Sequence, residues 1–103
     1  LKYEKIYFSR GTVQFWYGDL DDAVQNFQRV AARTDELDLN TGVMAWMRLG
    51  QIHDLKGQRP QAVEAYRKVI ALAPQSEAAK ESRRYMSSPY RREASANTGA
   101  LGA

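Results

Sequence analysis

The chain has 103 residues, 44% of them hydrophobic, which is the length and apolar content of one folded domain. It contains no cysteine, which excludes disulfides and thiolate metal sites, and no apolar run approaches the roughly 20 residues that cross a bilayer. The net charge of +3 lies in residues 83–103, because residues 1–82 hold 11 basic and 11 acidic residues. The sequence leaves the cellular compartment open.

The chain is expected to form about five helices and no strand. The first helix covers residues 3–17, where apolar side chains recur every three or four positions, and Gly18 ends it. The aspartates that follow Gly18 are suited to the start of a second helix, which runs to about Arg33. The first two helices therefore form a hairpin with a very short turn.

The third helix is expected to run from about Val43 to Lys56 and to end at a glycine. Residues 34–42 are polar and are expected to form the connection to it. Asn40 and Thr41 are the candidate caps of this third helix, because their side chains accept hydrogen bonds from free backbone N–H groups.

Prolines and a serine mark the remaining helix ends. Pro60 suits the first turn of a fourth helix, and Pro74 requires that helix to end before it. Ser76 is the expected cap of a fifth helix, which Pro89 closes. Residues 89–103 are first basic and then of low complexity, which is typical of a tail.

Two stretches of the chain match each other at an offset of 39 residues, so the sequence contains two copies of one helical hairpin. The matched pairs include Tyr7 with Trp46, Gly11 with Gly50, Ala23 with Ala62, and Phe27 with Tyr66. Duplicated units of about this length stack side by side and bury a continuous core. Such arrays bind partners on a surface.

The second copy carries a recognisable motif. Its residues are Trp46, Leu49, Gly50, Ala62, Tyr66 and Pro74. This spacing resembles the tetratricopeptide repeat, whose pattern is Trp-x2-Leu-Gly-x2-Tyr, then Ala-x3-Phe, then Pro. The first copy departs from the pattern, since Tyr7 replaces the Trp and Arg10 replaces the Leu.

The resemblance implies an all-α fold of antiparallel helix-turn-helix repeats stacked as a short α-solenoid. Repeat 1 is expected at about residues 4–37, repeat 2 at about 43–76 and a capping helix at about 75–87, within a domain of residues 1–88. The family's packing positions fall on Tyr7, Gly11, Ala23, Phe27, Trp46, Leu49, Gly50, Ala62, Tyr66 and Pro74. The stretch from Leu49 to Leu72 is most similar to bacterial members of the family.

In this family the first helix of each repeat lines a concave groove that binds partners. Carried over by position, the groove residues are Lys5, Phe8, Thr12, Phe15, Trp16, Met44, Met47, Gln51, Asp54 and Leu55. Aromatic and methionine side chains suit an apolar segment of a partner protein. Two other interpretations stay open: Phe15 and Trp16 could belong to the core of a short array, or could contact neighbouring repeats.

The predicted function is a protein–protein interaction or scaffold module within a larger bacterial protein. No nucleophile–base pair, metal-ligand cluster or phosphate-binding loop is present, so no catalysis, cofactor or metal is expected. A second copy of the chain is a further possible partner, because apolar residues of the first helix such as Tyr3 and Ile6 have no preceding repeat to pack against. The alternatives are binding of nucleic acid or an anionic surface through the Arg-rich end, and a non-catalytic accessory domain of an enzyme.

Overall fold

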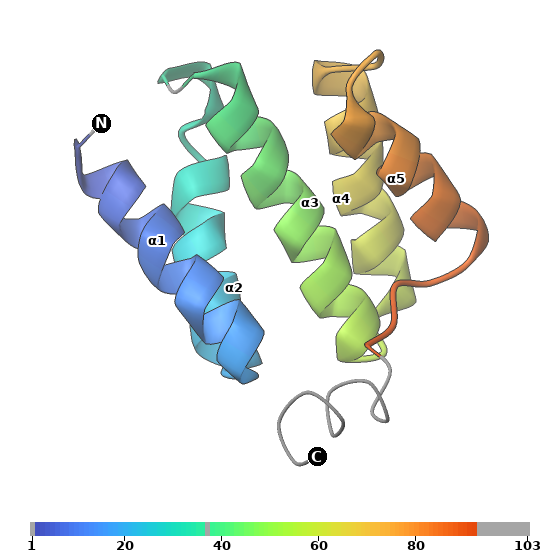
Figure 1. Cartoon of the computed structure of the whole chain (residues 1–103), viewed down its shortest axis with the longest axis horizontal. Coiled ribbons are helices and arrows are strands. Elements are labelled where there is room, and N and C mark those ends of the chain that lie inside the picture. Colours follow the sequence, from blue (N-terminus) through green and yellow to red (C-terminus); the bar gives the residue numbers. More distant parts are fainter. Residues whose placement is uncertain (1, 37, 93–103) are drawn as a thin grey trace.

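The computed structural model describes residues 2–36 and 38–92, and within those ranges the only regular elements are helices. The helices are α1 (Lys2–Tyr17), α2 (Leu20–Ala31), α3 (Leu39–Leu55), α4 (Arg59–Leu72) and α5 (Glu77–Ser87), with one 3₁₀ turn at Thr34–Glu36. In Figure 1, α1 and α2 form one antiparallel hairpin, α3 and α4 form a second, and α5 packs beside α4. The predicted all-α fold of stacked hairpins is confirmed. Most of the predicted tail, residues 93–103, lies outside the described residues.

Most helix ends lie where the sequence predicts them. Gly18 and Gly57 follow α1 and α3 with φ angles of +88° and +73°, a left-handed conformation that favours glycine. Pro60 lies in the first turn of α4. Ser76 caps α5, because its hydroxyl oxygen accepts a hydrogen bond from the backbone N–H of Ala79 at 3.0 Å.

The predicted start of the third helix is wrong. Helix α3 begins at Leu39, four residues before Val43, and its cap is Asp38 rather than Asn40 or Thr41. The Asp38 carboxylate accepts hydrogen bonds from both the backbone N–H and the hydroxyl of Thr41, at 2.9 and 2.8 Å. These bonds hold the pKa of Asp38 below its ordinary value, the backbone bond being the larger cause.

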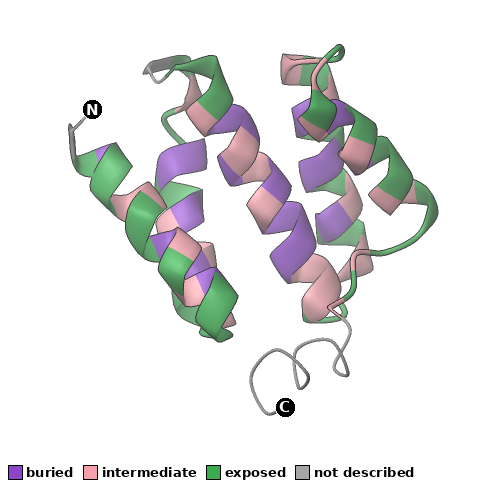
Figure 2. Ribbon diagram, in the orientation of Figure 1, coloured by how far each residue is buried: buried purple, intermediate pink, exposed green. Residues whose placement is uncertain are grey.

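The core runs along the facing sides of α2, α3 and α4 (Figure 2). One buried cluster joins the two hairpins and includes Phe15, Phe27, Val30, Leu49 and Ile52. A second cluster joins α3 and α4 to α5 and consists of Val43, Met47, Val69 and Ala79. The helices are therefore held together in series, each packed on the next along the chain.

In both hairpins a glycine of the first helix meets an aromatic ring of the second. A β-carbon built on Gly50 would lie 2.4 Å from Cε1 of Tyr66, and one built on Gly11 would lie 3.1 Å from the Phe27 ring. Gly11 and Gly50 are 39 positions apart, and so are Phe27 and Tyr66. The sequence duplication thus corresponds to a duplicated packing contact.

Candidate partner-binding face

The ten predicted groove residues lie on α1 and α3 and differ widely in exposure. Lys5 and Trp16 are exposed, and Phe8, Thr12, Met44 and Leu55 are half-buried. Phe15, Met47 and Gln51 are buried. The Asp54 side chain is also completely buried. The pattern has two causes: α5 covers Met47, and a segment from the C-terminal part of the chain covers the ends of α1 and α3.

That segment is residues 89–92, which follow α5. In Figure 1 the chain leaves α5 and turns back toward the C-terminal end of α3. The Tyr90 ring lies 6.3 Å from the Phe15 ring and 5.3 Å from the Tyr85 ring, measured between centroids. The Tyr90 backbone N–H donates to the carboxylate of Asp54 at 2.9 Å. Tyr90 therefore bridges Phe15 and Asp54, which are equivalent positions of the two sequence copies.

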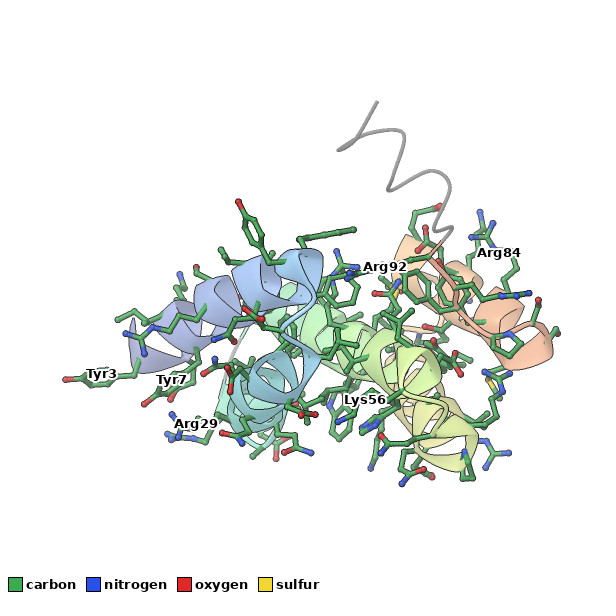
Figure 3. The ribbon with its side chains drawn as sticks, turned by 90° about the horizontal axis from the view of Figure 1, so that it is seen from below. Tyr3, Tyr7, Arg29, Lys56, Arg84 and Arg92 are labelled. Carbon is green, nitrogen blue, oxygen red and sulfur yellow. The ribbon has the colours of Figure 1, made fainter. Side chains whose placement is uncertain are left out.

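Arg92 reaches the end of α1 (Figure 3). Its guanidinium carbon lies 4.1 Å from the centroid of the Phe15 ring and 5.2 Å from that of Trp16. One guanidinium N–H donates to the backbone carbonyl of Phe15 in the last turn of the helix. Aromatic faces and a helix C-terminus both carry partial negative charge, so both attract this cation.

Asp54 is the centre of a buried polar network. Its carboxylate accepts hydrogen bonds from Arg59 at 2.9 and 3.0 Å, from the Tyr66 hydroxyl at 2.7 Å and from Tyr90. Arg59 also donates to two carbonyls in the last turn of α5, at 2.7 and 2.8 Å. Burial, and then the bond to Asp54, raise the pKa of Tyr66. One carboxylate thus links α3, α4 and the segment after α5.

Arg48, like Arg92, lies over the rings of Phe15 and Trp16. The Arg48 guanidinium carbon lies 5.1 Å from the centroid of Phe15 and 5.4 Å from that of Trp16, and Arg48 donates to the side-chain oxygen of Gln51 at 2.8 Å. Burial lowers the pKa of Arg48.

We call the site formed by Phe15, Trp16, Asp54 and Tyr85 the aromatic end.

An open trough continues from Arg48 between α3 and α5, and we call it the methionine trough. It consists of two adjacent hollows of about 290 and 410 Å³, which share Met44, Glu77 and Ala78. The first is also lined by Met47, Arg48 and Glu81. Because methionine side chains adapt their shape, such a floor accommodates varied apolar side chains.

Three residues of this face were not predicted from the sequence. Tyr90 and Arg92 were expected in a tail or on an Arg-rich surface, and Arg48 was not expected in the groove. The Tyr–Arg interleaving near residues 84–92 was visible, but no local pattern shows which distant residues it contacts. A hollow of about 300 Å³ on another side of α3, lined by Trp46, His53 and residues of α2 and α4, was not predicted either.

The helical hairpin of α3 and α4, with its glycine-to-tyrosine contact, coincides with a known sequence family. Residues 43–76 match the family model described as tetratricopeptide repeat. This segment is therefore similar to a tetratricopeptide repeat. Repeats of this kind typically serve as non-catalytic surfaces for protein partners.

The tetratricopeptide match ends at Ser76, directly before α5, and does not extend to α1 and α2. A search of the curated proteins and a search of the solved structures each returned no match. Among the helices that the structure describes, none has the length and apolar character needed to cross a membrane.

Proposed function

We propose that this chain is a protein-interaction module that binds a partner segment along the inner face of α1, α3 and α5. One observation carries the proposal: this face already holds a non-helical segment of the chain itself, residues 89–92, through both side-chain and backbone contacts. A face that binds one short segment can bind another of suitable chemistry.

The open parts of the face suit a mixed apolar and polar partner. At one end Trp16 has 57% of its surface exposed, which is a large area for an anchoring contact. At the other end the methionine trough has an apolar floor with Glu77 and Glu81 at its side. A partner long enough to reach both ends would contact α1, α3 and α5 together.

Peptide display on the full chain tests this proposal, with the footprint of each selected peptide mapped by NMR chemical shifts. We expect shifts at Trp16 and Met44, and Trp16→Ala should weaken binding about tenfold, as loss of one anchoring side chain costs about 1–2 kcal/mol. Arg67→Ala, an exposed change on α4, is the control. Footprints around Arg29, Arg67 and Lys68 would overturn the proposal.

We also propose that a second copy of the chain binds the outer face of α1. Ile6 and Val13 are 44% and 56% exposed there. The equivalent positions of the second copy, Ala45 and Ile52, are buried in the cluster that includes α2. The outer face of α1 therefore has the character of a surface on which another helix packs.

The Arg-rich end gives weaker support to nucleic-acid binding. The guanidinium group of Arg92 lies on Phe15, and Arg83 donates to the carbonyl of Pro74 at 3.0 Å. These two groups are therefore engaged within the domain.

A further inference from the structure

We infer that residues 90–92 are a built-in ligand of the aromatic end, and that this site selects partner segments in which an aromatic residue stands two positions before an arginine. The inference rests on the proposed function, since it names the chemistry of the partner and a competitor within the chain. It follows from the contacts that hold Tyr90 and Arg92 against the domain and from the exposure of Arg91 between them.

The aromatic position is defined by two rings and one carboxylate. The Tyr90 ring meets Tyr85 edge-to-face, at an interplanar angle of 82°, and lies tilted by 31° against Phe15. Edge-to-face and offset pairs of this kind add specificity beyond burial of apolar area. The Asp54 carboxylate accepts a hydrogen bond from the backbone N–H of Tyr90, a contact that any residue except proline can make. The rings thus select the side chain, and Asp54 sets the register.

The arginine position follows from the contacts of the segment. Tyr90 and Arg92 are half-buried against the domain, while Arg91 between them is exposed. Arg92 stacks on the Phe15 ring and donates to a helix-end carbonyl. A planar guanidinium can make both contacts at once, whereas the ammonium of a lysine is a compact, strongly hydrated charge.

The built-in segment has an advantage over a partner of the same sequence. Only Ser88 and Pro89 separate it from the end of α5, and a short tether gives an effective concentration in the range of about 1 mM. A partner therefore displaces it only by making additional contacts. The methionine trough, which adjoins Arg48, is where such contacts are available.

The test uses the full chain in three forms: wild type, Tyr90→Ala with Arg92→Ala, and Arg91→Ala as a control that removes the same charge from an exposed position. The probe is the five-residue peptide Ser-Pro-Tyr-Arg-Arg, the sequence of residues 88–92, titrated to millimolar concentrations. The readout is the indole N–H resonance of Trp16. Trp46 serves as the internal reference, because its indole nitrogen donates to Thr34 on another side of α3.

The double variant should keep its helical circular dichroism, since both substituted residues lie outside the helices. Its Trp16 resonance should shift while that of Trp46 stays in place. The peptide should then return Trp16 toward the wild-type position and should bind the double variant about 2–10-fold more tightly than wild type, in which the tethered segment competes. Arg91→Ala should behave as wild type. Peptides with Ala for Tyr, or Lys for the second Arg, should bind at least threefold more weakly.

Three outcomes would overturn the inference. The first is an unchanged Trp16 resonance in the double variant. The second is that the two altered peptides bind the double variant as tightly as the unaltered peptide does. The third is a Trp16 resonance that changes on dilution in the wild type but not in the double variant, because the segment would then come from a second copy. If display peptides map to the inner face but lack the aromatic–x–Arg spacing, the inference fails and the proposed function stands. If they map to the opposite face, the proposed function fails instead.

Discussion

Gly50 lies against the ring of Tyr66 with no room for a methyl group. The equivalent contact of Gly11 with Phe27 is looser, because a β-carbon would lie 3.1 Å from the ring there and only 2.4 Å from it at Gly50. We expect Gly50→Ala to lower the free energy of unfolding by about 1–3 kcal/mol through overpacking, because the buried Tyr66 ring cannot move aside. Gly11→Ala should cost less, since a shift of a few tenths of an ångström at Phe27 relieves it. Urea unfolding measures both; equal costs would contradict the difference in packing.

Asp54 is the most heavily hydrogen-bonded side chain of the candidate site. Asp54→Asn keeps its shape but removes the charge that pairs with Arg59. The cost should lie near the lower end of the about 3–5 kcal/mol seen for broken buried ion pairs, because 34% of the Arg59 side chain is exposed. Chemical denaturation would measure it.

Tyr66→Phe is the matched comparison for Asp54→Asn. It removes one of the donors to Asp54 but leaves Arg59 and Tyr90 in place, so it should cost only about 1 kcal/mol. If the two variants were equally stable, Asp54 would be no more than a hydrogen-bond partner of Tyr66.

At the scale of whole elements, the start of α3 depends on the Asp38 carboxylate. The pKa of Asp38 is lower in the folded chain than its unfolded value, so the stabilisation is full above about pH 4 and disappears as pH falls through the folded pKa. Asp38→Ala should therefore lower the melting temperature at neutral pH and have a smaller effect as the pH is lowered below about 4. Thermal melts across this range, with Asn40→Ala as control, would measure it; an equal loss at neutral and at acidic pH would contradict the charged cap.

The elements that could be predicted are those with local signals. Gly18, Gly57, Pro60 and Ser76 each restrict the backbone or supply a cap where they stand, so the sequence alone locates the helix ends beside them. The start of α3 was missed because several neighbouring residues can cap a helix, and only the tertiary structure shows that Asp38 does so.

The segment after α5 could not be predicted for a different reason. Its partners lie far away in the sequence: Tyr90 bonds to Asp54, 36 positions distant, and Arg92 to Phe15, 77 positions distant. No periodicity or turn signal encodes such contacts. For Phe15 the sequence left groove and core both open; it is buried in the core cluster, and Tyr90 and two arginine side chains also lie against its ring.

For the whole molecule we expect self-association through the outer face of α1. Tyr3, which points away from the other helices in Figure 3, is 64% exposed, and Ile6 and Val13 continue the same stripe. Burying one such aliphatic side chain is worth about 1.5–3 kcal/mol. Val13→Lys should therefore raise the dimer dissociation constant by about tenfold or more.

Sedimentation at tens of micromolar measures this change. Gln25→Lys adds the same charge at an exposed position of α2 and is the control. A wild-type chain that sediments as a monomer would contradict the expectation.

The bond between Arg92 and the carbonyl of Phe15 has a consequence for how the molecule opens. In an open stack each repeat touches only its neighbours, so the two ends fray independently of each other. Here Arg92, which follows α5, is bonded to the last turn of α1, so the two ends of the stack are linked. The amides of α1 and those of residues 90–92 should then exchange hydrogen with solvent as one cooperative unit. Arg92→Ala should separate that unit into two, with faster exchange along α1 even where no contact was removed.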